Sequence, residues 1–211
     1  MELLIKLIFC YLIGSISGSL VIGKFRSVDI RIAGSGNAGA TNAFRTQGSG
    51  FALCVLLIDM AKGFISAKYI STMVLPYFSS VRVDVGFVII LCGIAAILGH
   101  VFPIYHGFKG GKGAGAALGA VLAIHWLAFI PAISIWILTL VITGYVGLGT
   151  MLAPVSMLVY SLIPGVDSPQ YFIHFCIFLI FFIIFTHRSN IDRMRKGIEN
   201  RFDKFMIFRA N

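Results

Sequence analysis

The stretch that decides the fold is residues 113–166, GAGAALGAVLAIHWLAFIPAISIWILTLVITGYVGLGTMLAPVSMLVYSLIPGV, which contains no charged residue. As one continuous helix it would be about 80 Å long, at ~1.5 Å per residue, whereas the hydrocarbon core of a bilayer is about 30 Å thick. The stretch must therefore cross a membrane two or three times. Helix-breaking residues favour three short crossings, and they are Pro131, Gly144, Gly147, Gly149 and Pro164-Gly165.

The composition of the whole chain excludes most soluble classes of protein. Of its 211 residues, 58% are hydrophobic and only 12% are charged, and the mean hydropathy is +0.95. A soluble domain is about one-quarter charged, and a disordered chain has low hydrophobicity, so neither class fits. We therefore predict an all-α integral membrane protein in which residues 1–211 form a single multi-pass domain.

Charge-poor runs elsewhere predict four further spans, at about residues 7–23, 51–77, 85–105 and 168–186. The second run is unusual because it contains Asp59, Lys62 and Lys68. Asp59 and Lys62 are three residues apart and would share one helical face, which favours a self-neutralising pair. The four cysteines lie singly in apolar runs, so they predict neither a disulfide nor a metal site.

The basic residues predict the orientation in the membrane. Of the 17 Lys and Arg residues, 13 fall after the first span, after the third span, or in the C-terminal tail. Positive charge concentrates on the cytoplasmic side, and all three segments reach that side if seven helices span the membrane, with the N-terminus outside and the C-terminus inside. Six helices would place the tail opposite Lys112. The net charge of +9 then fits membrane lipids or an anionic substrate, and we expect no nucleic-acid partner.

Three segments are too polar or too rich in glycine to be ordinary loops, namely residues 34–45, 99–113 and 187–199. In the seven-helix arrangement they share one face, as a common site requires. Glycine lets backbone N–H groups approach an anion, and a helix that opens on such a loop adds its dipole. Side chains suited to phosphate accompany the glycines: Ser35, Asn37, Thr41 and Asn42 as neutral donors, Arg45 as a planar fork, and Lys109 and Lys112 as ammonium groups.

Two histidines lie at the ends of predicted spans. His187 stands where the last span meets the tail, three residues before Asn190, where a histidine can position a substrate or move a proton. His100 precedes Pro103 after the third span, and both a packed and a site role stay open for it. Glu199 is expected to brace the basic tail.

The three polar segments resemble, in order, the three motifs of the bacterial acylphosphate:glycerol-3-phosphate acyltransferases, which are seven-span membrane enzymes. The resemblance covers the whole chain and includes Asp29-Ile30-Arg31 and the pattern Asp59-x-x-Lys62-Gly63; one departure is Ala114-Gly115-Ala116, where the family usually has Val-Ala-Thr. It implies transfer of a fatty acyl group from acyl phosphate to the 1-hydroxyl of sn-glycerol 3-phosphate. The products would be lysophosphatidic acid and inorganic phosphate, made at the cytoplasmic face of the bacterial inner membrane as the first acylation of phospholipid synthesis, without cofactor or metal.

The resemblance and the residue chemistry together give a set of predicted site residues. Catalytic roles are predicted for Ser35, Arg45, Lys112, His187 and Asn190. Substrate-binding roles are predicted for Gly36, Asn37, Thr41, Asn42, Lys109, Gly110, Gly111, Gly113 and Arg188.

Several alternatives stay open at this point. Acyl phosphate is already activated, so the site must mainly position the substrates and stabilise the developing oxyanion. The base is either His187 or the phosphate of the donor, and we favour the phosphate, with His187 positioning the acceptor. Ser35 as a covalent nucleophile is a lesser alternative. The competing class of function is a transporter or flippase for a phosphorylated metabolite or lipid, although the chain shows no internal repeat.

Overall fold

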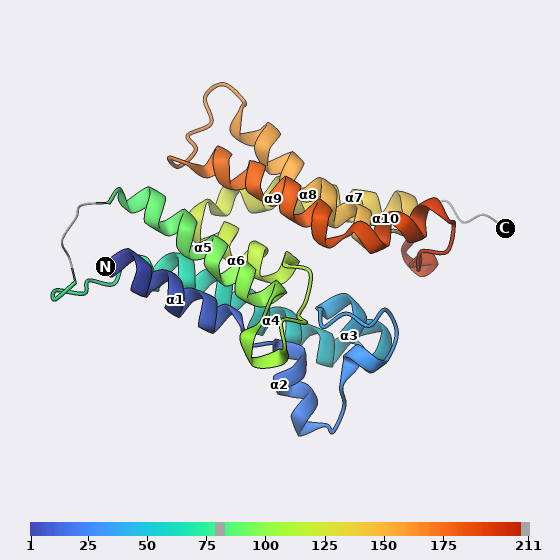
Figure 1. The fold of residues 1–211 in the computed structure, drawn as a ribbon. Helices are drawn as coiled ribbons and strands as arrows, with labels where there is room; N and C mark the ends of the chain where they lie inside the picture. Colours follow the sequence, from blue (N-terminus) through green and yellow to red (C-terminus); the bar gives the residue numbers. More distant parts are fainter. Residues whose placement is uncertain (79–82, 208–211) are drawn as a thin grey trace. The chain divides into compact units, whose positions relative to one another are not determined.

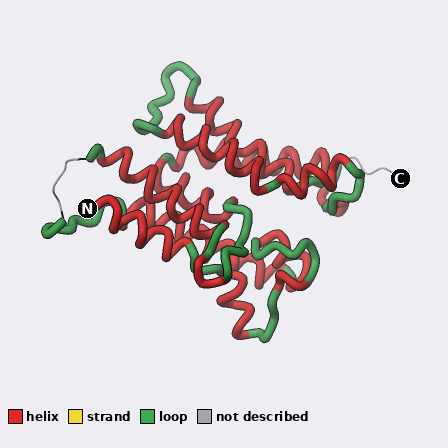
Figure 2. The backbone as a smooth tube through the Cα atoms, viewed as in Figure 1, coloured by secondary structure: helices red, strands yellow, loops and turns green. Residues whose placement is uncertain are grey.

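The computed structural model describes residues 1–78 and 83–207, and all regular elements in these ranges are helical (Figures 1 and 2). The chain divides into two compact units, Met1–Ile124 and His125–Asn211. The all-helical class predicted from the composition is thus confirmed for the described residues. Arg209, the last basic residue of the tail, lies outside the described ranges.

The first unit consists of the helices α1 (Glu2–Gly14), α2 (Gly18–Phe25), α3 (Ala40–Gln47), α4 (Ser49–Ile65), α5 (Val85–Val101) and α6 (Ala114–Ile124), with a π-helical turn at Ser66–Ile70 and 3-10 turns at Ile30–Ile32 and Ile104–His106. Within it, α1 packs along α5, and α4 packs along α6. A Cβ at Gly63 would overlap the backbone of Ala116, and one at Gly119 would overlap the backbone of Met60. Small residues therefore let α4 and α6 come close together, as is common between membrane helices.

The second unit consists of α7 (Phe129–Thr143), α8 (Val146–Ser161), α9 (Phe172–Thr186) and α10 (Arg188–Arg195), with 3-10 turns at Trp126–Ala128 and Asp203–Phe205. Within this unit α8 contacts both α7 and α9. Large apolar side chains remain exposed on its helices, such as Phe181 at 72% and Ile130 at 55%. Exposed apolar side chains of this size suit a lipid environment.

The charge-free stretch 113–166 forms three helices, α6, α7 and α8, but one of the predicted breaks is wrong. The chain breaks at His125, between α6 and α7, and not at Pro131. Pro131 is the third residue of α7, where the backbone N–H has no intrahelical acceptor, so proline is tolerated there. The break between α7 and α8 falls at Gly144, as predicted.

The predicted first span, residues 7–23, is also broken. The helices α1 and α2 meet at a bend of 43°. The backbone groups released at this break bind side chains of α4, because the Ile16 carbonyl accepts from Lys62 Nζ at 2.8 Å and the Gly18 N–H donates to Asp59 Oδ1 at 3.4 Å. An irregular backbone at membrane depth persists only with such partners. The predicted Asp59–Lys62 pair is confirmed, with 3.0 Å between Lys62 Nζ and Asp59 Oδ1.

Three helical segments of the described chain are long and apolar enough to cross a bilayer, namely Ser49–Ile70, Val85–His106 and Trp126–Thr143. Two bent pairs raise this number to five if each pair counts as one span: α1 with α2, and α9 with α10, which are bent by 56°. The helices α6 and α8 are apolar but shorter.

Candidate active site

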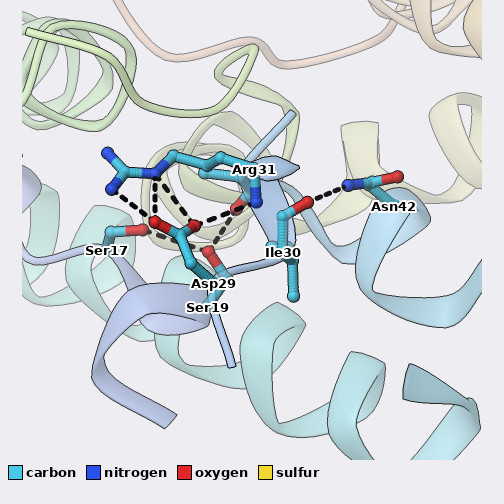
Figure 3. Close-up of polar contacts among 7 residues, drawn as sticks. Ser17, Ser19, Asp29, Ile30, Arg31 and Asn42 are labelled. Atoms are coloured by element: carbon cyan, nitrogen blue, oxygen red, sulfur yellow. Dashed lines mark hydrogen bonds and ion pairs between the residues drawn. The ribbon is translucent and has the colours of Figure 1, made fainter. Parts of the chain in front are cut away.

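The first predicted motif forms a loop that runs into α3 and is held by one buried side chain. Asn42, which is 1% exposed, donates from its amide nitrogen to the carbonyl oxygens of Ile30 at 2.8 Å and Ala33 at 3.1 Å. Its oxygen accepts from the backbone N–H of Ser35 at 2.8 Å. Figure 3 shows the bond to Ile30. Gly34 has a φ of +60° and a Cβ there would overlap the Asn42 oxygen, so the loop requires glycine at this position.

This geometry shows that Asn42 braces the loop, and its predicted contact with the substrate stays a prediction. We predicted it as a neutral donor to the substrate, but both hydrogens of its amide are used by carbonyl oxygens of the loop. Its side chain also fixes the backbone of Ser35. Thr41 and Arg45 are four residues apart and so lie on one side of α3, and both are partly buried, as are Ser35 and Asn37, whereas Gly36 is exposed.

The second predicted motif is a glycine-rich loop that lies against His100 and opens α6. The backbone N–H of Gly111 donates to the carbonyl oxygen of His100, and that of Gly110 donates to Val101, both at 3.2 Å. A Cβ at Gly111 would overlap the imidazole ring of His100, so glycine is needed for this close approach. The predicted residues differ in exposure: Lys109 is exposed, Gly110 and Lys112 are partly buried, and Gly111 and Gly113 are buried.

Both glycine-rich loops end at a helix N-terminus, as the sequence predicted. The helix α3 begins directly after Gly39, and α6 begins directly after Gly113. The N–H groups of a first helical turn have no intrahelical partner and carry the positive end of the helix dipole. Each loop thus offers backbone donors to an anion, with a cation from the same motif, Arg45 or Lys112, as the expected charge partner.

A charged pair flanks the residue to which Asn42 donates. The guanidinium of Arg31 donates to Asp29 from Nη2 at 2.7 Å and from Nε at 3.0 Å, and the Arg31 backbone N–H donates to Asp29 at 2.9 Å (Figure 3). These bonds hold the pKa of the Asp29 carboxyl below its ordinary value. The pair fixes the 3-10 turn Ile30–Ile32, from which the Ile30 carbonyl reaches Asn42.

The third predicted motif lies in the second unit, at the junction of α9 and α10. His187 is 4% exposed, and its Nδ1 lies 2.8 Å from the carbonyl oxygen of Ile183. Because a carbonyl oxygen only accepts, Nδ1 is the donor, and the neutral ring then has no proton on Nε2. Arg188 is exposed and folds back, donating to the Phe185 carbonyl at 3.1 Å and lying 4.7 Å from the centre of the Phe185 ring.

Glu199 links two residues of this motif. Its Oε1 accepts from the Asn190 side chain at 2.8 Å, and its Oε2 accepts from Arg193 Nε at 2.6 Å. The Glu199 side chain is 2% exposed. Asn190 also packs against α8, because a Cβ at Gly147 would lie 3.0 Å from its amide nitrogen. These contacts fit the bracing role that we expected for Glu199.

The structure brings the first two motifs into the first unit and places the third in the second unit. A site shared by all three motifs stays a prediction. Within the described ranges, no cluster of three or more His, Cys, Asp or Glu side chains could hold a metal ion.

Sequence reasoning missed the bracing role of Asn42 and the place of His100. The signal for His100 was available, because ionisable residues within apolar spans are rare and seek one another. His100 Nδ1 lies 3.4 Å from Asp59 Oδ1, beside the predicted Asp59–Lys62 pair but without a hydrogen bond to it.

Comparison of the amino-acid sequence with known proteins shows the family to which this chain belongs. Residues 4–197 match the model of the family described as "Glycerol-3-phosphate acyltransferase". The chain belongs to the glycerol-3-phosphate acyltransferase family. It is 40% identical over 206 residues to a glycerol-3-phosphate acyltransferase of Shouchella clausii, covering 96% of this chain and 97% of that protein. It is 37% identical over 202 residues to that of Aquifex aeolicus, covering 96% and 100%.

Solved structures agree with this family assignment. The chain is similar to a crystal structure described as PlsY (YgiH), an integral membrane glycerol 3-phosphate acyltransferase, in its glycerol 3-phosphate form, with a TM-score of 0.81, 34% identity and coverage of 96% of both chains. The lysophosphatidic acid form of the same protein gives a TM-score of 0.80. This member of the glycerol-3-phosphate acyltransferase family is therefore an integral membrane protein by both sequence and fold.

Proposed function

We propose that this membrane protein transfers a fatty acyl group from acyl phosphate to the 1-hydroxyl of sn-glycerol 3-phosphate. Acyl transfer to glycerol 3-phosphate follows from the family, whose model matches residues 4–197. The products are lysophosphatidic acid and inorganic phosphate, and the reaction is the first acylation of phospholipid synthesis. Acyl phosphate as the donor rests on the resemblance of the three motifs.

The observation that carries the proposal is the pair of glycine-rich loops that open α3 and α6. Both reacting molecules carry a phosphate, and each loop leads into the first turn of a helix, whose backbone N–H groups lie at the positive end of the helix dipole. Arg45 suits a phosphate through its planar fork, and Lys112 suits it as a compact charge. Two such loops in one unit therefore match two phosphate-bearing substrates.

In the proposed reaction the 1-hydroxyl oxygen of the acceptor attacks the acyl carbonyl carbon. The bond between this carbon and the phosphate oxygen breaks, and phosphate leaves. The hydroxyl proton passes to the leaving phosphate, and His187 Nε2 accepts a hydrogen bond that positions the acceptor. The bond from His187 Nδ1 to Ile183 orients the ring for this role. No cofactor or metal is needed, because the anhydride is already activated.

The same proposal includes a topology. We infer seven spans: the three long segments, the two bent pairs, and the shorter helices α6 and α8. The N-terminus is then outside and the C-terminus cytoplasmic, which puts the basic segments on the cytoplasmic face of the inner membrane. The chain acts as one domain that takes glycerol 3-phosphate from the cytosol and the donor from the lipid.

Purified protein in detergent tests the reaction. Release of phosphate should require both acyl phosphate and glycerol 3-phosphate, and lysophosphatidic acid should form in equal amount. Uptake of a phosphorylated metabolite into vesicles, without phosphate release in detergent, would instead indicate a transporter.

The His187→Gln variant tests the choice of base. We expect the KM for glycerol 3-phosphate to rise about tenfold, equivalent to about 1.4 kcal/mol, because Gln retains polarity but misplaces the acceptor. The kcat should stay within about threefold of wild type, since the donor phosphate takes the proton. A collapse of kcat that no pH or substrate concentration restores would show that His187 is the base.

A further inference from the structure

A buried ionic cluster lies beside the predicted site and has no role in the reaction described so far. Asp59 of α4 is 2% exposed, Lys62 of α4 is 4% exposed and His100 of α5 is 5% exposed. Asp59 Oδ1 is the shared centre, 3.0 Å from Lys62 Nζ and 3.4 Å from His100 Nδ1. We call these three residues the ionic cluster.

On one side, the ionic cluster supports the second motif. The Gly111 N–H donates to the His100 carbonyl at 3.2 Å, and Gly111 lies directly on the imidazole ring. In the first turn of α6, which follows this loop, a Cβ at Gly115 would lie 2.8 Å from the Asp59 Cβ. The loop that opens α6 thus lies against His100, and the first turn of α6 lies against Asp59.

On the other side, the ionic cluster supports the first motif through the break between α1 and α2. Lys62 and Asp59 bind the Ile16 carbonyl and the Gly18 N–H, respectively. The next residue, Ser19, is fully buried and its Oγ donates to the Ala38 carbonyl at 2.8 Å, within the first glycine-rich loop.

The hydroxyl of Ser17 lies 3.2 Å from that of Ser19 at this break (Figure 3). The ionic cluster therefore contacts the second glycine-rich loop directly through His100 and reaches the first one through Gly18 and Ser19.

A purely structural role explains these contacts less well. A buried ion pair is often no more stable than apolar residues of similar volume, and ionisable side chains inside a membrane carry an added cost. Besides lying between α4 and α5, the side chains of the ionic cluster bind backbone at the helix break and lie against the loop that opens α6. Their effect is to fix how far apart the two loops lie.

We propose that Asp59, Lys62 and His100 are positioning residues that set the spacing of the two glycine-rich loops and thereby the affinity for the phosphate of glycerol 3-phosphate. This inference rests on the proposed function, because it assigns the loops to phosphate binding. None of the three residues needs to touch a substrate. Their contribution is to hold Ser35, Gly110 and Gly111 at a fixed separation before the substrate arrives.

The test is the double variant Asp59→Asn/Lys62→Met, which removes both charges together and so leaves no uncompensated buried charge. We expect it to fold, and its KM for glycerol 3-phosphate to rise about tenfold or more, while kcat and the KM for acyl phosphate stay within about threefold. His100→Leu, of similar volume but without the imidazole nitrogen that lies beside Asp59, should raise the same KM.

Titration calorimetry with glycerol 3-phosphate gives the binding affinity without turnover, and should show the same loss for both variants. A wild-type KM and affinity in either folded variant would overturn the inference.

A second buried lysine pair in the same unit provides the matched control. Lys6 is 7% exposed, pairs with Glu2 at 2.9 Å and donates to the Ser71 carbonyl at 2.9 Å, so it resembles Lys62 in burial and bonding. It contacts neither glycine-rich loop. Glu2→Gln/Lys6→Met should leave the KM for glycerol 3-phosphate unchanged. Any effect should be confined to a lower unfolding temperature in detergent.

The control also separates the two possible failures. An equal rise of this KM in the control would overturn the inference, because any buried lysine pair would then have the effect. Wild-type protein that shows no acyl transfer would contradict the proposed function instead, and calorimetry on the same variants would still decide whether the ionic cluster controls phosphate binding.

Discussion

Two buried asparagines hold two of the motifs, and they do so in different ways. Asn42 is 1% exposed and bonds only to backbone groups of its own loop. Asn190 is 7% exposed and donates to Glu199, whose other oxygen binds Arg193. The first brace is neutral and local, whereas the second depends on a carboxylate nine residues away.

The difference predicts opposite sensitivities to charge. A neutral hydrogen bond contributes about 1 kcal/mol to stability and is lost when a carboxylate replaces the donor. A hydrogen bond to a charged group contributes about 1.5–3 kcal/mol and weakens when that charge is removed. The Asn42 brace should therefore fail when it gains a charge, and the Asn190 brace should fail when Glu199 loses its charge. Substitutions that change charge but hardly change shape test this directly.

Asn42→Asp should have the largest effect. The new carboxylate would face the carbonyl oxygens of Ile30 and Ala33 in a site that is 1% exposed, and both donated hydrogen bonds would be lost. We expect a loss of about 3–5 kcal/mol in stability, as for an uncompensated buried charge. Thermal unfolding in detergent measures this, and initial rates should show a fall of about 100-fold or more in kcat/KM.

Gln47→Glu is the control for this prediction, because it adds the same charge at the end of the same helix. Gln47 is partly buried and has no bond to the loop in the described contacts. A charge at a helix C-terminus costs about 0.3–1 kcal/mol, so the control should change stability little and leave the rates unchanged. An Asn42→Asp protein as stable as the control would show that the loop does not depend on the amide.

Glu199→Gln should have a smaller effect of the opposite kind. The amide has one accepting oxygen, so if that oxygen still accepts from Asn190, the NH2 group faces Arg193 Nε and the bond to Arg193 is lost. We expect a loss of about 1.5–3 kcal/mol in stability, with a moderate fall in kcat as Asn190 becomes less fixed. Unfolding temperature and initial rates measured in the same detergent check both.

The matched control for Glu199 is Asp192→Asn. Asp192 pairs with Lys196 on α10 at 2.9 Å, but both side chains are about 60% exposed, so the pair should contribute little. Equal destabilisation by the two substitutions would mean that burial of Glu199 is unimportant and that the comparison between the two braces is mistaken.

The sequence predicted the class of fold and the motifs better than it predicted the breaks and the braces. An uncharged run of apolar residues requires membrane helices whatever its partners are, so residues 113–166 were interpreted correctly as three helices. The break predicted at Pro131 was wrong because proline interrupts a helix only beyond its first turn, and the sequence did not show where this helix begins. The break between α1 and α2 depends on Asp59 and Lys62, more than 40 residues away, which no local pattern reveals.

The residues of the first motif could be named from the sequence, but their roles could not all be assigned. An asparagine in a glycine-rich loop serves a substrate or the loop itself with the same chemistry, and only the position of Ile30 and Ala33 around Asn42 separates the two roles. For His100 the sequence did hold a signal, its place near the end of an apolar span, but its neighbours are Asp59 on another helix and a loop that follows it.

Removing the charge of the Asp29–Arg31 pair should change stability least. This partly exposed charged pair lies next to the neutral brace made by Asn42, so it tests how much charge contributes there. Because the Asp29 pKa is lowered in the folded protein, the pair stabilises the fold fully above the unfolded pKa of about 3.9. This contribution is lost as the pH falls through the lowered folded pKa. Both side chains are about one-third exposed, so Asp29→Asn should cost about 0.2–1 kcal/mol near neutral pH.

Unfolding temperatures of wild type and Asp29→Asn, measured from neutral pH down to about pH 3, test this. The difference between them should be constant above about pH 5 and should shrink below about pH 4. Added salt at about 1 M should reduce it at neutral pH, since exposed charges are screened. A difference that persists unchanged at low pH and high salt would show that Asp29 acts through its neutral bond to the Arg31 N–H, which would make the turn before Asn42 as independent of charge as the brace itself.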